Sequence, residues 1–124
     1  MSQINVTTKP ADPALRRLRK LCLSLPETAE VIAWGHPTFR AGTKMFAAYG
    51  EDKGERSIGF RVGKRRQQDL VKGRRFYITP YAGRFGWVSL KVAGKLDWNE
   101  IAGLVLESYR MTANKRMLAA LEED

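Results

Sequence analysis

The spacing of the apolar residues changes along this chain, and that change most constrains its fold. Near the N-terminus, Leu15, Leu18, Cys22 and Leu25 recur every three or four residues, as on the buried face of an α-helix. Over residues 57–62 the apolar side chains alternate instead, which is typical of a β-strand with one buried face. Helical spacing returns towards the C-terminus. Helices at both ends of a strand-rich middle indicate an α+β domain.

Capping and turn residues divide the chain into expected elements. The first helix begins at the N-cap Asp12, with proline in its first turn, and ends at Pro26. A second cap at Asp97 begins a helix that breaks at 111–113 before a last helix. Between these helices lie four β-prone segments, at 31–34, 38–41, 45–49 and 57–62, from which we expect three strands. We then expect a helix at 64–72 and two further strands at 76–79 and 86–92.

Short connections between neighbouring strands favour antiparallel pairing. We therefore expect a two-layer α+β fold with an antiparallel sheet. The order would be helix, three strands, helix, two strands and a C-terminal pair of helices. The length of 124 residues suits one domain, expected at 12–122 after a flexible lead at 1–11.

Composition and the N-terminal sequence indicate the cellular compartment in which we expect the protein. No apolar run approaches the roughly 20 residues that cross a bilayer, so we expect no membrane partner. The N-terminus lacks the pattern of a signal peptide, and the one cysteine allows no internal disulfide. A cytoplasmic location is the expectation that follows. Cys22 falls on the apolar face of its helix, so we interpret it as a buried small hydrophobic residue.

The positive charge of the chain is concentrated in one stretch. The formal net charge is +9, from 22 Lys and Arg against 13 Asp and Glu. Residues 56–96 hold eleven of the basic residues and only one acidic residue, Asp69. A field of this kind attracts polyanions, nucleic acid above all. Ordinary solvation of a basic surface remains the alternative.

This basic stretch supplies the predicted DNA contacts. Cations at 64–66 would begin a short helix, where they oppose the helix dipole, and a bound phosphate would remove that conflict. Trp87 alternates with Val88, so it lies on the other face of its strand, beside Arg84. If helices leave that face open, Trp87 can stack on bases; if they cover it, Trp87 is buried. The predicted contacts are Lys64, Arg65, Arg66, Lys72, Arg74, Arg75, Arg84, Trp87 and Lys91.

We find no residue pattern that indicates catalysis. His36 is the only histidine, and neither Cys22 nor any carboxylate stands at metal-ligand spacing from it. Glu27 and Glu30 are a candidate carboxylate pair, although a solvated turn explains them as well. No glycine-rich phosphate loop and no nucleophile with a base partner are present. The expectation is a protein that is not an enzyme, with no catalytic residue, no metal site and no cofactor.

Five tracts, in their order and spacing, carry a family resemblance. The tracts are Leu25-Pro26-Glu27-Thr28, Trp34-Gly35-His36-Pro37-Thr38-Phe39, Lys44-Met45-Phe46-Ala47, Gly83-Arg84-Phe85-Gly86-Trp87-Val88, and Ser108-Tyr109-Arg110 through Lys115-Arg116. With them the chain resembles the MmcQ/YjbR family from Leu15 to Leu121. The resemblance implies a compact α+β fold with an antiparallel sheet and a DNA-binding role for a double wing of hairpins. It brings no catalytic residues.

Two other functions stay open from the sequence. One branch of that family takes its name from antibiotic biosynthesis, so a small-molecule ligand is possible. Such a ligand would occupy a pocket between sheet and helices, lined by Trp34, Phe39, Tyr81 and Trp98. A protein-interaction module that pairs through its C-terminal helix is the other alternative. We expect a monomer or a weak homodimer.

Overall fold

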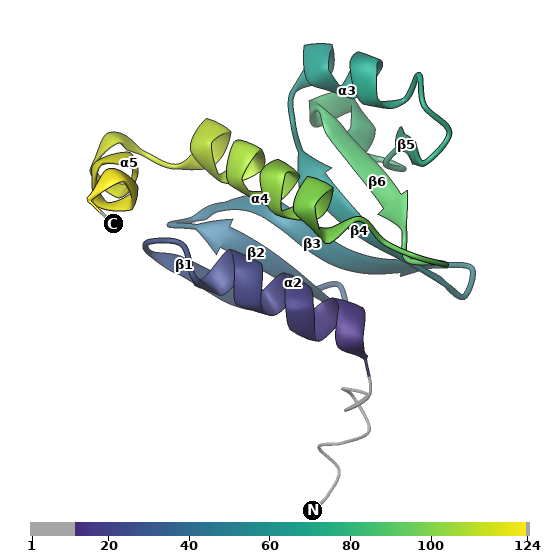
Figure 1. Ribbon diagram of the computed structural model, residues 1–124, viewed down its shortest axis with the longest axis horizontal. Coiled ribbons are helices and arrows are strands. Elements are labelled where there is room, and N and C mark those ends of the chain that lie inside the picture. Colours follow the sequence, from purple (N-terminus) through teal and green to yellow (C-terminus); the bar gives the residue numbers. More distant parts are fainter. Residues whose placement is uncertain (1–11, 124) are drawn as a thin grey trace, which may run out of the picture.

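The computed structural model describes residues 12–123, and there the chain forms one antiparallel sheet packed against helices (Figure 1). The predicted α+β class is confirmed. The predicted lead at 1–11 lies outside the described residues. The elements are α2 (Pro13–Leu23), β1 (Thr28–Ala33), β2 (His36–Ala41), β3 (Lys44–Asp52), β4 (Glu55–Arg61), α3 (Lys64–Leu70), β5 (Phe76–Ile78), the 3-10 helix η1 (Ala82–Phe85), β6 (Trp87–Lys91), α4 (Trp98–Thr112) and α5 (Lys115–Glu122).

Four strands precede α3, one more than expected. The break between the first two β-prone segments is a tight turn, in which Trp34 and Gly35 both have positive φ, and it joins β1 to β2 as a hairpin. The six strands lie in the order β1-β2-β3-β4-β6-β5, and every neighbouring pair is antiparallel. The late strand β6 therefore pairs with β4, and β5 forms an edge of the sheet.

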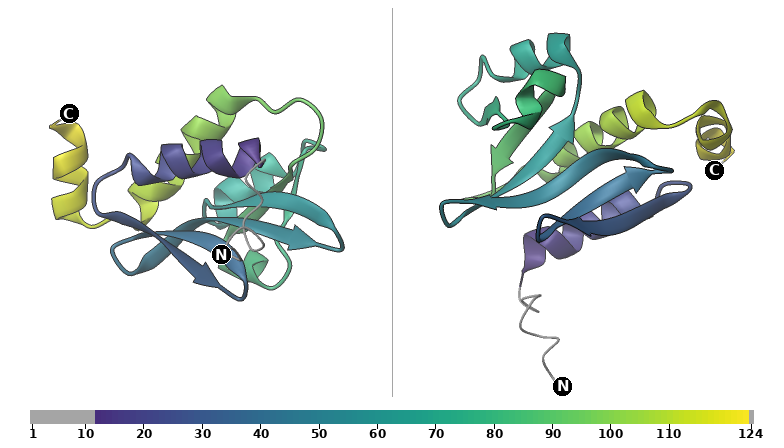
Figure 2. Two further views of the ribbon diagram at one scale, coloured as in Figure 1. Left: turned by 90° about the horizontal axis from the view of Figure 1, so that it is seen from below. Right: turned by 180° about the vertical axis from the view of Figure 1, so that it is seen from behind.

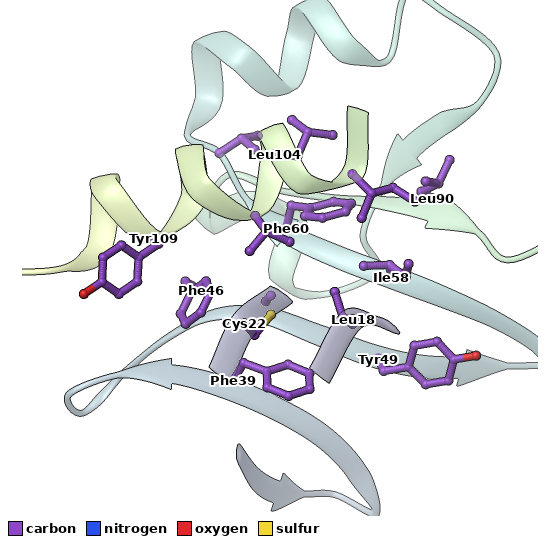
Figure 3. Close-up of a cluster of buried hydrophobic side chains, with 14 of the residues drawn as sticks. Leu18, Cys22, Phe39, Phe46, Tyr49, Ile58, Phe60, Leu90, Leu104 and Tyr109 are labelled. Carbon is purple, nitrogen blue, oxygen red and sulfur yellow. The ribbon is translucent and has the colours of Figure 1, made fainter. Parts of the chain in front are cut away.

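The core lies between the sheet and two helices. α2 and α4 cover the same side of the strands, and the view from behind in Figure 2 shows the strands in front of both helices. Leu18, Cys22 and Phe60 point into the space between the layers (Figure 3). Phe46 meets Tyr109 edge to face, with ring centroids 5.6 Å apart. The predicted burial of Cys22 is confirmed.

The predicted helix starts are confirmed by their capping hydrogen bonds. Asp12 accepts from the backbone N–H of Leu15 at 3.2 Å, and Asp97 accepts from two N–H groups of the first turn of α4. The first helix ends at Leu23, earlier than the proline that was expected to stop it. No helix among residues 12–123 is both long and apolar enough to span a bilayer.

Candidate nucleic-acid interface

A contact between two glycines joins β4, α3, η1 and β6. The carbonyl of Gly86 accepts from the N–H groups of Val62 and Gly63 at 2.9 and 3.0 Å. A Cβ on Gly86 would lie 2.7 Å from the Gly63 Cα, so a side chain does not fit there. Both glycines also have φ of +87°, which disfavours other residues. The start of α3 is therefore held against the end of η1.

The buried side chain of Gln67 also joins α3 to η1 and β6. Its side chain is only 2% exposed, and its Nε2 donates to the carbonyls of Gly83 and Trp87 at 2.7 and 2.9 Å. Sequence reasoning missed this residue, because in a short charged helix nothing distinguishes a buried glutamine from a solvated one. Each of these carbonyls also accepts from a backbone N–H, of Gly86 and of Thr79, so the amide of Gln67 adds a second hydrogen bond to both.

Four of the nine predicted contact residues form ion pairs. Arg66 contacts Glu107 of α4 at 3.0 Å, and Arg75 contacts Glu100 at the start of that helix. Two further pairs are Lys72 with Asp69 at 3.6 Å and Lys91 with Glu55 at 3.4 Å. The predicted conflict at the start of α3 is thus partly relieved within the chain, since Arg66 has a carboxylate partner.

The other predicted cations have no carboxylate partner among the described side chains: Lys64, Arg65, Arg74 and Arg84. Lys64 and Arg65 follow Gly63, and Arg84 lies two residues before Gly86, so the glycine contact brings the backbone of these three residues to one place in the fold. Arg74 lies in the connection between α3 and β5, and no contact places it with them.

Arg61 belongs to this group, although it was not among the predicted contacts. It pairs in register with Trp87 on the neighbouring strand and lies two residues before Gly63. It also has no carboxylate partner in the described part of the chain. Alternation in 57–62 did place it on the outward face, which was the available signal. We name Arg61, Lys64, Arg65 and Arg84 the junction cluster.

Trp87 is buried, which contradicts its prediction as an exposed contact. The predicted strand face is correct, because Val88 is in the core and Trp87 pairs with Arg61 on the other face. However, only 8% of the residue is exposed. The indole packs against Gly59, where an added Cβ would be 3.4 Å from its Cε3 atom. A glycine on the neighbouring strand therefore makes room for the ring against the sheet, and its face is not available to a base.

Other aromatic residues are exposed beside the cluster. Tyr81 is 95% exposed and Phe85 61% exposed, and both lie in the connection between β5 and β6. The guanidinium of Arg84 lies over the ring of Phe85, 4.9 Å from its centroid.

The aromatic pocket predicted for a small molecule is absent from the described structure. Phe39 is fully buried in the core, whereas Trp34 and Tyr81 project from the surface. Trp98 packs beneath the guanidinium of Arg17 at 5.0 Å. These four side chains come from different layers of the fold and line no common cavity.

A different hollow, of about 460 Å³, lies between α2 and the β1–β2 hairpin. Asp12, His36, Tyr49 and Arg56 contribute to its lining. Asp12 already accepts from the hydroxyl of Tyr49 at 2.9 Å and contacts Arg56 at 3.5 Å. Burial, together with that hydrogen bond, raises the pKa of Tyr49 to about 12. Asp12, Tyr49 and Arg56 are thus already partners of one another.

The carboxylate pair considered from the sequence is divided between two ion pairs. Glu27 binds Arg116 at 2.6 Å, and the hydrogen bond from that guanidinium lowers the pKa of Glu27. Glu30 binds Arg19 at 2.8 Å. Among the described residues, no three His, Cys, Asp or Glu side chains lie where they could hold a metal ion together. Burial raises the pKa of the Cys22 thiol, which disfavours the reactive thiolate.

Comparison with known proteins identifies relatives of this chain. A family model described as YjbR matches residues 23–111. A crystal structure of the Deinococcus radiodurans protein DR2400, with a DUF419 domain, is similar at a TM-score of 0.70 and 18% identity, over 88% of this chain and 85% of that one. A Pseudomonas syringae protein is similar at a TM-score of 0.57 and 20% identity, over 70% and 88%. No curated protein matches the chain.

Proposed function

The chain belongs to the YjbR family, and on that premise we propose that it is a non-catalytic nucleic-acid-binding domain that holds DNA through its phosphates. Contacts to phosphates fix the position of a protein on DNA but carry no base information. The proposed domain therefore has a weak sequence preference.

The junction cluster is the observation that carries this proposal. Four cations from β4, α3 and η1 lie within two chain positions of Gly63 or Gly86, which contact each other, and no described carboxylate pairs with any of the four. Like charges brought together repel one another, so an arrangement without counterions is a local inconsistency of the kind found at binding sites. Phosphate oxygens would relieve that repulsion.

The ion-paired cations have a smaller role in this proposal. Arg66 and Arg75 would have to leave Glu107 and Glu100 before binding a phosphate. Reversing their charge would also break contacts that hold α3 and the following connection to α4. The junction cluster is thus the better target for substitution.

Two variants of equal net charge test the proposal. The first, K64Q/R65Q/R84Q, removes three cations of the junction cluster. The second, K20Q/K95Q/K115Q, removes three exposed lysines from elsewhere in the fold. Fluorescence anisotropy with a labelled duplex at about 0.1 M salt should show a loss on the order of 100-fold for the first variant, since each phosphate contact releases counterions. The second variant should lose less than about threefold, because it weakens only the general field.

Equal losses in the two variants would contradict the proposal, because the charge would then act without a defined site. Thermal unfolding of both variants provides the control for folding. All six side chains are exposed, so neither melting temperature should fall by more than a few degrees.

A further inference from the structure

The connection between β5 and β6 places two exposed aromatic rings beside the junction cluster. Tyr81 directly precedes η1 and Phe85 is its last residue, and Arg84 of the cluster lies over the ring of Phe85. Figure 1 shows β5, β6 and α3 grouped at one end of the molecule, away from α2 and α5.

The backbone of this connection is held firmly. Gly83 donates to the carbonyl of Thr79 at 2.8 Å, and Gly86 donates to Gly83 at 2.9 Å. Gln67 binds the Gly83 carbonyl from the other side. Tyr81 has φ of +64°, a conformation that residues with side chains adopt rarely and keep only where the surroundings impose it. These hydrogen bonds therefore fix the backbone that carries the two rings.

Rings and cations together match the chemistry of one form of DNA. An aromatic side chain can stack on any base, but in a duplex the base faces are covered by their neighbours. In a single strand the faces are accessible, and the phosphates that alternate with them need cations. Two exposed rings and Arg84 in this connection, together with Lys64 and Arg65 at the start of α3, offer both kinds of contact.

We propose that the β5–β6 connection binds single-stranded DNA. Tyr81 and Phe85 stack on unpaired bases, while Lys64, Arg65 and Arg84 hold the phosphates beside them. This inference rests on the proposed DNA-binding function and adds the form of DNA that the site prefers.

The test compares labelled oligo(dT) with a blunt duplex of the same length in fluorescence anisotropy. The wild-type protein should bind the single strand about tenfold more tightly, because only that strand offers bases to the rings. The variant Y81N/F85L removes both exposed aromatic rings. This variant should lose at least about tenfold in affinity for the single strand and keep its affinity for the duplex.

Trp34 supplies a matched control. It is 90% exposed and also has positive φ, but it lies in the β1–β2 turn, at the opposite edge of the sheet from β5. W34N should leave the affinity for both forms of DNA unchanged. Y81N alone is a second probe, because Tyr81 is almost fully exposed, and it should show part of the loss.

The outcomes separate this inference from the proposed function. If the wild-type protein binds both forms equally, or Y81N/F85L loses affinity for both to the same extent, the preference for single strands is overturned and DNA binding stands. The same holds if W34N reduces single-strand binding as much as Y81N/F85L does. If neither form binds in a salt-dependent way, both proposals fail.

Discussion

Trp34 and Tyr81 combine a positive φ with a side chain that is almost fully exposed. A positive φ costs a residue with a side chain about 1–3 kcal/mol. Burial of the ring would offset such a cost, but neither ring is buried. The backbone strain at each position therefore lowers the stability of the fold without compensation from burial of the ring.

Trp34 lends itself to a stability test, because it precedes Gly35 in a two-residue hairpin turn. Asparagine followed by glycine is the sequence that such turns favour. W34N should raise the free energy of unfolding by about 1 kcal/mol, measured by urea denaturation. W34A also removes the ring but lacks the polar side chain by which asparagine stabilises a positive φ, so it is the control. Equal stabilities of W34N and W34A would show that the backbone at position 34 is not strained.

Trp87 and Cys22 show how much of a residue's environment the sequence pattern predicts. Alternation placed Trp87 on the correct face of its strand and Cys22 in the core. The burial of Trp87 depends on Gly59, which lies 28 positions earlier and faces Ser89 across the strand pair. Strand pairing and register decide which side chains adjoin a tryptophan. Neither the pairing nor the register of these strands could be predicted from the alternation pattern of one sequence.

At the scale of elements, α3 and η1 act as one unit. They are joined by the contact of Gly63 with Gly86 and by the two hydrogen bonds of Gln67. The helix at 64–72 was predicted, and it is found at Lys64–Leu70. Its docking on η1 was not predicted, because η1 is a single turn of 3-10 helix without a sequence signal of its own.

Gln67 tests whether this unit supports binding. Q67A removes two buried hydrogen bonds between α3 and the η1–β6 segment, so the free energy of unfolding should fall by about 1–3 kcal/mol in urea denaturation. DNA affinity should fall as well, since η1 and Arg84 lose their anchor. Q68A, at the exposed neighbouring position, should change stability by less than about 0.5 kcal/mol. Similar stabilities of Q67A and Q68A would contradict the anchoring role of Gln67.

Over the whole molecule, tertiary neighbours decide which positive charges can act. The sequence located the basic stretch at 56–96, but four of its predicted contacts have carboxylate partners. Glu107 lies 41 positions from Arg66, and Glu100 lies 25 positions from Arg75. Only the packing of α4 brings these residues together. The candidate site is therefore smaller than the basic stretch, and it includes Arg61, which the sequence left out.

The salt dependence of duplex binding tests the junction cluster most directly. Four phosphates neutralised by Arg61, Lys64, Arg65 and Arg84 give a slope of about −4 in a plot of log affinity against log salt concentration. The variant K64Q/R65Q/R84Q retains one of these cations, so its slope should be about −1. A slope near zero for the wild-type protein, or an unchanged slope in the variant, would contradict DNA binding at this cluster.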